Sequence, residues 1–442
     1  MPAMLFLPFF GYGNMRNPGT QNRLLPAAFA ALVVLLAGCA TQESGTSSST
    51  PAFSMTDPLQ VPDRSAFAPT SPRPLAGQYH QVNWSSLPGW QQDDARHLWL
   101  TFYNNCRGLM RPVSGSKAMP ARAAPAVWQP VCQAAAQSGI DPRSDDAATV
   151  KAFLEQYLQP WEVTENGKNT NTVTGYYEPV VHGSRSQGGD YQWPMYATPD
   201  DLLSIDLGQQ YPELAGKRIR GRLVGKNIVP YDTRAQIGQR DTKPPVIVWL
   251  NDPVEAFFLQ VQGSGRVQLD DGSTIRLAYD NHNGRPYSSI GKWLADKGEL
   301  PLAQANMQNI KAWARAHPDR VEEMLNANQA MVFFREEALS DDAAGPKGAY
   351  GIPLVAERAV AVDPNYVPLG SPLFLATTRP HSTQPLQRVV FAQDTGAAIK
   401  GVARTDFFWG SGDAAGELAG RMKQTGRVWI LWPRDAGVPE AR

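Results

Sequence analysis

The sequence has few charged residues and no excess of either sign. Only 19% of its 442 residues are charged, and 41 basic residues balance 41 acidic ones. Domains that bind nucleic acid usually carry a basic surplus that neutralises phosphates. The balance therefore argues against nucleic acid as a partner.

The motifs of several large enzyme classes are also missing. The six histidines are scattered, with no His-Glu-x-x-His motif and no cysteine beside any of them, so the sequence predicts no metal site. There is no Gly-x-Ser-x-Gly elbow and no Gly-x-x-x-x-Gly-Lys-Ser/Thr loop, which argues against a serine hydrolase and a P-loop enzyme. Carboxylates remain as the candidate catalytic groups, and we expect no cofactor.

Cysteine is scarce, and the first of the three cysteines ends an apolar run. Residues 24–38 carry no charge, a run too short for a membrane-spanning helix but suited to a signal peptide. The ending Leu-Ala-Gly-Cys resembles a bacterial lipoprotein signal. This resemblance implies that residues 1–38 are removed, that Cys39 carries lipid, and that Ala40 directs the protein to the periplasmic face of the outer membrane.

Residues 39–79 are predicted to form a disordered tether. About half of the stretch 41–75 is Ser, Thr or Pro, and such a composition buries too little apolar surface to offset chain entropy. Cys106 and Cys132 would lie in an oxidising periplasm, where a disulfide between them is plausible. Two buried free thiols are the alternative.

The folded part changes from helical to β character near Thr172. Before it, apolar residues recur at helical spacing, most clearly over 150–158 ahead of Pro160. After it, short runs of β-branched and aromatic residues between Gly and Pro, including 256–265, predict strands in barrels or sandwiches. One interlude, 303–328, is predicted as two short helices.

Two aspartates near the C-terminus are the densest candidate for chemistry. Asp394 and Asp406 flank a Gly-rich turn, and the aromatic run 407–409 follows the second of them. Desolvation by aromatic neighbours and repulsion from a second carboxylate both raise a carboxyl pKa, which keeps a proton available near neutral pH. Alternatively, both aspartates only accept turn or cap hydrogen bonds.

Five longer motifs occur in a fixed order between residues 172 and 433. They are TGYYEP (174–179), FLQVQGSG (258–265), NGRPYSSIG (283–291), GIPLVAERAVAVDPNYVPLGSPLFL (351–375) and QDTGAAIKGVARTDFFWGSGDAAGELAG (393–420). Together they resemble the membrane-bound lytic murein transglycosylase A family. The last motif is similar to the family's small domain that is named for three aspartates.

The resemblance implies a mainly β fold with N-terminal helices, in which a double-psi β-barrel and a smaller inserted β-domain enclose a groove. Residues 80–179 would supply the helices and the first barrel strands. Residues 180–329 would form the insertion, and residues 330–435 would complete the barrel as the three-aspartate domain. The implied partner is a peptidoglycan glycan strand in the groove, and we expect a monomer.

The resemblance also implies a reaction without metal or cofactor. The β-1,4 bond between N-acetylmuramic acid and N-acetylglucosamine is cleaved, and the muramoyl O6 attacks to give a 1,6-anhydro ring. Because the sugar supplies its own nucleophile, one carboxyl group can serve first as acid and then as base, whereas ordinary glycosidases need two. The implied acid/base is Asp406, with Asp394 as its supporting neighbour and Asp363 as the third aspartate. The enzyme would be an exolytic lyase, although the residues themselves do not distinguish attack at an end from attack within a strand.

The implied substrate contacts lie at the domain junction. They are Thr174, Gly175, Tyr176, Tyr177, Glu178, Gln262 and Ser264. Aromatic rings with amide and hydroxyl partners suit sugars, whose apolar faces lie between hydroxyl groups. For the two tyrosines, strand alternation with one ring buried and one exposed is the alternative.

Two rival functions are open. The triplet Asp394-Thr395-Gly396 is the signature of aspartic peptidases, but these need a second copy so that two carboxylates share a proton, and the sequence holds no second triplet. The other rival is a murein-binding lipoprotein without catalysis. The presence of Asp406 beside its aromatic neighbours favours the enzyme.

Overall fold

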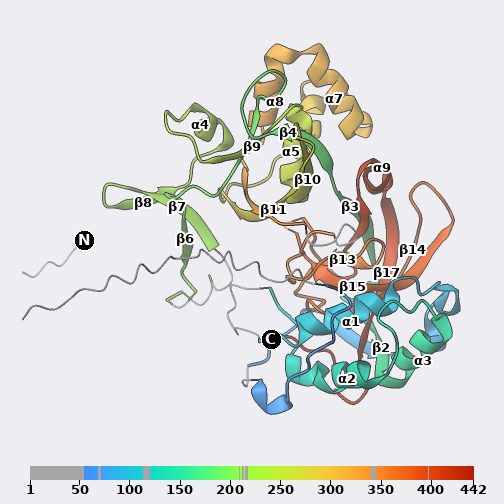
Figure 1. The fold of residues 1–442 in the computed structure, drawn as a ribbon. Coiled ribbons are helices and arrows are strands. Elements are labelled where there is room, and N and C mark those ends of the chain that lie inside the picture. Colours follow the sequence, from blue (N-terminus) through green and yellow to red (C-terminus); the bar gives the residue numbers. More distant parts are fainter. Residues whose placement is uncertain are drawn as a thin grey trace, which may run out of the picture. The chain divides into compact units, whose positions relative to one another are not determined.

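The computed structural model describes residues 54–67, 71–112, 120–208, 210–211, 214, 218–339, 345–396 and 398–442. This part of the chain is mainly β with a smaller number of helices, as predicted (Figure 1). Within it, no helix combines the length and the apolar character needed to cross a membrane. The predicted signal peptide and Cys39 lie outside the described residues.

Six strands of the largest sheet pair in a closed ring. They are β3 (Thr170–Glu178), β13 (Ala359–Val362), β14 (Pro372–Thr378), β15 (Pro385–Asp394), β16 (Thr405–Ser411) and β17 (Lys423–Pro433). β17 pairs with both β14 and β3, β3 pairs in parallel with β16, and β13 joins β16 to β15, which pairs with β14. Strands from before and after the insertion therefore build one sheet, as the predicted barrel requires.

Two further strands extend this sheet, and its core combines aliphatic with large aromatic side chains. β1 (Gln78–Gln81) pairs with β2 (Leu158–Thr164), which pairs with β17. Phe374, Phe391 and Trp429 are among the largest fully buried side chains of the described chain. Strands buried on both faces read as continuous apolar runs, which is why β13, β14, β15 and β17 were recognisable in the sequence.

Helices α1 (Leu98–Leu109), α2 (Pro125–Gln137) and α3 (Ala147–Tyr157) share the core of this sheet. The helix predicted ahead of Pro160 is confirmed as α3. Its first turn is capped by Asp146, whose side chain accepts a hydrogen bond from the Ala148 N–H, as N-cap residues do. The apolar faces of the helices thus close one side of the strands that carry the candidate site.

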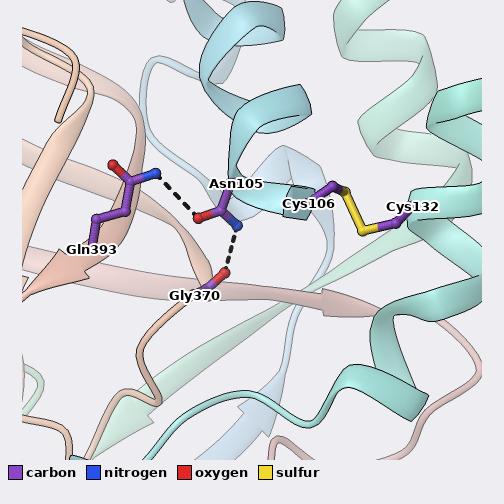
Figure 2. The surroundings of a disulfide bond; sticks show 5 residues. All are labelled: Asn105, Cys106, Cys132, Gly370 and Gln393. Atoms are coloured by element: carbon purple, nitrogen blue, oxygen red, sulfur yellow. Dashed lines mark hydrogen bonds between the residues drawn. A yellow bond between two sulfur atoms is a disulfide. The ribbon is translucent and has the colours of Figure 1, made fainter. Parts of the chain in front are cut away.

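A disulfide between Cys106 and Cys132 joins α1 to α2 (Figure 2), which decides the alternative that the sequence left open. Asn105, next to it, donates from Nδ2 to the Gly370 carbonyl at 2.7 Å and accepts from Gln393 Nε2 at 3.1 Å. The cross-linked helix is therefore held to the residue that precedes Asp394.

Removing this cross-link should cost stability. Replacement of Cys106 and Cys132 by Ala is expected to lower the free energy of unfolding by about 3 kcal/mol, because the bond closes a long loop in the unfolded chain. Urea unfolding of the variant and the wild type measures the difference. When a reductant is present, the free energy of unfolding of the wild type should approach that of the variant. A wild-type urea midpoint that does not change with reductant would contradict the prediction.

The residues before β1 pack on the folded body. Met55 and Leu59 are buried, the Leu59 N–H donates to Tyr103 Oη at 2.8 Å, and Asn104 Nδ2 donates to the Met55 carbonyl at 2.8 Å. The prediction of a disordered tether through residue 79 is therefore wrong for the described residues from Ser54 onward. A few apolar side chains in a Ser- and Pro-rich stretch are enough to attach it to α1.

The insertion contains two sheets and five helices in its described part. The larger sheet runs in the order β12 (Val332–Glu337), β11 (Thr274–His282), β10 (Ser264–Leu269), β4 (Val180–Ser184), β9 (Val246–Leu250) and β5 (Trp193–Tyr196). The smaller sheet comprises β6 (Leu203–Asp206), β7 (Arg218–Val224) and β8 (Asn227–Pro230). The helices are α4 (Arg234–Gln239), α5 (Pro253–Gln262), α6 (Ile290–Asp296), α7 (Met307–Ala316) and α8 (Val321–Asn326). Because β12 pairs with β11, the insertion extends past the predicted end at residue 329.

Two predictions within the insertion have different outcomes. The two short helices predicted over 303–328 are confirmed as α7 and α8. The run 256–265, predicted as a strand, is helical up to Gln262 and enters β10 only after Gly263. Asp252 caps the helix, Pro253 occupies its first turn, and Gly263 ends it at φ 79°. A short apolar run alone does not separate helix from strand, and these flanking signals decide it.

Candidate active site

Asp394 and Asp406 lie on the two neighbours of one short strand. Ala361 of β13 is paired with Asp394 of β15 on one side and with Asp406 of β16 on the other. The two aspartates therefore stand at the same level, two strand spacings or about 10 Å apart between backbones. The fold thus brings together the two residues that the sequence singled out.

Asp406 is held by a short polar chain. Thr174 is its partner in the parallel pairing of β3 with β16 and donates from Oγ1 to Asp406 Oδ1 at 2.7 Å. Arg404 Nη2 donates to the same Thr174 hydroxyl at 2.9 Å. Burial raises the pKa of Asp406, while the Thr174 hydrogen bond and the Arg404 charge oppose the rise. The carboxyl group therefore keeps its proton to a higher pH than an exposed aspartate does.

Arg404 was not assigned a role from the sequence. Its only signal was its place two residues before Asp406 in the Arg-Thr-Asp triplet. Besides Thr174, it donates from Nη1 to the Thr172 carbonyl at 3.1 Å. It therefore links β3 to the start of β16 and brings a positive charge close to the candidate acid.

Asp394 is a second carboxyl group with a raised pKa. Its Oδ1 accepts hydrogen bonds from the N–H groups of Ala349 and Thr395, both at 2.9 Å. Burial raises the pKa of Asp394 from 3.8 to about 6; the Asp406 charge adds to this rise, and the hydrogen bonds to Asp394 oppose it. The alternative interpretation as a turn acceptor is correct for its hydrogen bonds, but a turn acceptor on the surface would not show this shift.

Replacing Asp394 by Asn should remove a pH dependence of stability. Because the folded-state pKa is raised, the proton favours the folded state; this contribution is fully present below about pH 4 and is lost as the pH rises through about 6. The wild-type free energy of unfolding should therefore fall, relative to that of the variant, between about pH 4 and pH 7. Asn keeps the acceptor oxygen, so the comparison isolates the charge. Urea unfolding across this range tests it, and parallel curves would show that Asp394 is not the source.

The two tyrosines of β3 have different surroundings. Tyr176 packs on Phe408 with ring centroids 5.1 Å apart. Its hydroxyl is buried without a hydrogen bond of good geometry among the described residues, yet it lies near enough to Asp394 to lower that carboxyl's pKa. Tyr177 lies against Gly416 of α9 (Asp413–Arg421), where an added Cβ would meet its ring at 2.8 Å. Only Tyr176 is directed to the pair of aspartates.

Three other predicted contact residues lie where β3 meets the insertion or α9. Gly175 has no room for a side chain, because a Cβ would come within 2.8 Å of the Ala419 backbone. Gln262, the last residue of α5, accepts a hydrogen bond from the Tyr177 N–H at 3.3 Å, and Ser264 begins β10. Gln262 and Ser264 are both partly exposed.

The position of Glu178 does not fit the prediction that this residue contacts substrate. Its side chain has no exposed surface; Oε1 accepts from Arg276 Nε at 2.7 Å, and Oε2 accepts from Arg266 Nε at 3.0 Å and Ser411 Oγ at 2.7 Å. These partners belong to β11, β10 and β16. Glu178 therefore fastens the end of β3 to the insertion, with no face left for a sugar.

Asp363 stands apart from the other two aspartates. Its Oδ1 accepts from the Asn365 N–H at 3.1 Å and side chain at 2.9 Å, and its Oδ2 accepts from the Gly401 N–H at 2.8 Å. Gly401, at φ 102°, belongs to the segment between Asp394 and Asp406. A cavity of about 470 Å³ opens beside Asp363 and Lys400. Asp363 thus fixes the segment that separates the other two, and no hydrogen bond of the described residues joins it to either.

The described residues include no cluster of three His, Cys, Asp or Glu side chains placed to hold a metal ion. The chemistry available is that of two partly buried carboxyl groups, a hydroxyl and a guanidinium. Such a set can donate and accept one proton, which is what cleavage assisted by a nucleophile within the substrate requires.

Two parts of the chain match known protein families. Residues 172–335 match the family described as the MltA specific insert domain, and residues 358–432 match the 3D domain. The first match ends within β12, in agreement with the longer insertion.

Related proteins extend the match to most of the chain. Membrane-bound lytic murein transglycosylase A of Escherichia coli K12 is 33% identical over 62% of this chain and 69% of its own. The crystal structure of MltA from Neisseria gonorrhoeae is 36% identical, with a TM-score of 0.69 over 87% of this chain and 98% of that one. The structure of E. coli MltA with bound chitohexaose is 25% identical, with a TM-score of 0.54 over 82% and 96% of the two chains. This chain belongs to the membrane-bound lytic murein transglycosylase A family.

Proposed function

We propose that this protein is a lytic transglycosylase that cleaves the β-1,4 bond between N-acetylmuramic acid and N-acetylglucosamine in peptidoglycan. The observation that carries the proposal is the partly buried Asp406 carboxyl group, with its raised pKa and its hydrogen bond to Thr174. The sugar oligomer bound to a related enzyme supports a glycan as substrate.

In the proposed reaction, protonated Asp406 gives its proton to the glycosidic oxygen as the bond to the muramoyl C1 breaks. The muramoyl O6 then bonds to C1, and the Asp406 carboxylate takes the proton from O6, so that the enzyme returns to its starting state. Because O6 belongs to the same sugar, its effective concentration at C1 is high. No water enters the product.

The neighbours of Asp406 support both steps. The Thr174 hydroxyl occupies Oδ1, which leaves Oδ2 to carry the proton to substrate. The positive charge of Arg404 lowers the pKa of Asp406 and so stabilises the carboxylate formed after the first step. Asp394 is the supporting carboxyl group, placed to stabilise positive charge that develops on the sugar ring.

The proposed substrate contacts come from the junction of β3 with the insertion. Tyr176, whose hydroxyl lies close to Asp394, and the partly exposed Gln262 and Ser264 are the side chains to which we assign these contacts. We include Thr174 because its hydroxyl donates a hydrogen bond to Asp406, and Tyr177 because its backbone N–H donates one to Gln262. Gly175 serves by letting β3 approach α9 closely.

Product analysis tests the proposal. Muropeptides released from purified murein should end in anhydromuramic acid, and their masses should be about 18 Da, one water, below those of hydrolysis products. The heavier products would establish a glycosidase instead. Cleaved peptide stems, blocked by a pepstatin-like inhibitor, would favour the aspartic peptidase, and binding without any product would favour the inactive lipoprotein.

The names of the relatives place them at a membrane. We propose that this chain is a monomer anchored to the periplasmic face of the outer membrane by lipid on Cys39. The apolar run that ends at this cysteine supports the anchor. The mass of the mature protein tests it, because lipid adds to the mass of the chain that begins at Cys39.

A further inference from the structure

The three-stranded sheet of the insertion (β6, β7 and β8 in Figure 1) has one entirely apolar face. Leu203 pairs with Gly221, Ile205 with Ile219, and Leu223 with Ile228, while Pro230 also pairs with Gly221. Paired residues share a face, and so do alternate residues along a strand. The face therefore consists of Leu203, Ile205, Ile219, Gly221, Leu223, Ile228 and Pro230, which we name the aliphatic face.

The aliphatic face points away from the rest of the insertion. Residues of the opposite face make the contacts with the body: Arg220 Nε donates to Asn281 Oδ1 at 3.2 Å, and Arg222 Nε donates to Asp232 Oδ1 at 2.9 Å. Leu223 is 60% exposed and Ile228 is 54% exposed. A contiguous apolar patch on the surface of a soluble protein is often a binding site.

We propose that the aliphatic face rests on the phospholipid bilayer that holds the protein's anchor. The inference depends on the proposed membrane anchorage. From Cys39 to Ser54 a fully extended chain spans at most about 50 Å. The folded body therefore stays close to the bilayer, where a weak apolar contact is formed at high effective concentration.

The composition of the patch fits lipid better than a protein partner. The aliphatic face has no Trp, Tyr or Arg, the residues that dominate binding energy in protein interfaces. Lys226, in the turn between β7 and β8, is exposed at the end of the sheet, where a cationic side chain favours anionic headgroups. Charge and apolar surface thus point to the same occupant.

The size of the patch argues against a second copy of this chain. Three strands of four to seven residues cover a face of about 300 Å², whereas a stable interface buries about 800 Å² on each partner. A contact of this size suffices for a protein that is already anchored.

The backbone limits how deep the contact goes. The outer edge of β8 has no partner strand in the described chain, and unpaired backbone groups are not tolerated inside hydrocarbon. The aliphatic face therefore lies at the boundary between headgroups and acyl chains, with only its side chains in the apolar layer.

Labelled full-length protein tests the inference. A Leu223→Cys variant carries an environment-sensitive fluorophore, and a Ser204→Cys variant carries the same label on the opposite face of the sheet. Both lipidated chains are reconstituted into vesicles of phosphatidylethanolamine and phosphatidylglycerol with nitroxide-labelled lipid. The label at residue 223 should shift to shorter wavelength and be quenched several-fold more than the label at residue 204.

Several results would overturn the inference. Equal quenching of the two labels would show that the face stays in water, and a shifted but unquenched label at residue 223 would show that protein covers it. A chain without lipid on Cys39 would remove the anchorage on which the inference depends.

A second variant separates this inference from the proposed function. Leu223→Asp combined with Ile228→Asp should abolish quenching of a label at Leu203→Cys, because two charges prevent contact with acyl chains. Both residues are more than half exposed, so folding and cleavage of dissolved murein fragments should be unchanged. Unchanged quenching in this variant contradicts the membrane contact. A wild-type protein that releases no anhydro products contradicts only the proposed reaction.

Discussion

Replacing Asp406 by Asn should slow the release of anhydro-muropeptides by about 10²- to 10⁴-fold, the usual contribution of a general acid and base. The amide oxygen can still accept the hydrogen bond from Thr174, so the geometry of the site is kept. What is lost is the proton for the glycosidic oxygen. Chromatography and mass spectrometry of products from purified murein give the rate.

Asp413 provides the matched control for this substitution. It is an exposed residue in the first turn of α9, seven positions along the chain from Asp406, and Asp413→Asn should retain the wild-type rate. A wild-type rate in Asp406→Asn would remove this residue from the mechanism. Full activity in Asp406→Asn together with a large loss in Asp394→Asn would exchange the roles of the two aspartates.

Replacing Glu178 by Gln should destabilise the protein by about 3–5 kcal/mol, the cost of removing one partner from a buried ion pair. Arg276 is 4% exposed and Arg266 is 15% exposed, so their charges would lose their shared carboxylate in a poorly hydrated place. The free energy of unfolding in urea measures the effect. Cleavage should also weaken, because β3 carries both Glu178 and Thr174.

Glu336 offers the same substitution at an exposed pair in the same part of the protein. Its carboxylate accepts hydrogen bonds from Nη1 and Nη2 of Arg185 on the surface of the larger inserted sheet, with about 43–45% of each side chain exposed. Glu336→Gln should change stability by less than about 1 kcal/mol. Equal losses in the two variants would mean that burial of Glu178 does not decide the effect.

Local patterns predicted several of the helices and strands of this fold. α3 was predicted from its spacing and from Pro160, and the buried strands near the C-terminus were predicted from continuous apolar runs. The pattern failed at α5, where the apolar run fits both a helix and a strand, and at the segment after Ser54, where composition hid Met55 and Leu59. In both places a few specific contacts outweighed an average property.

The candidate site was predicted in its residues but not in its geometry. The sequence places Asp394 twelve positions before Asp406, but their approach depends on Ala361, which belongs to another strand. Glu178 was given a substrate contact because an acidic residue inside a substrate motif gives no sign that it forms buried ion pairs with two distant arginines. Arg404 was overlooked because its contact with Thr174 crosses 230 positions of the chain. Pairings between distant segments cannot be read from local spacing.

The closed ring of six strands also sets the point in synthesis at which the candidate site can form. Thr174 pairs with Asp406 and, through the last strand β17, with Lys423. A chain synthesised from its N-terminus presents β3 early, but β3 has no neighbours in the ring until almost all of the chain has followed. The acid and the hydroxyl that holds it meet only then. A partly synthesised chain that lacks β16 and β17 therefore has no complete candidate site.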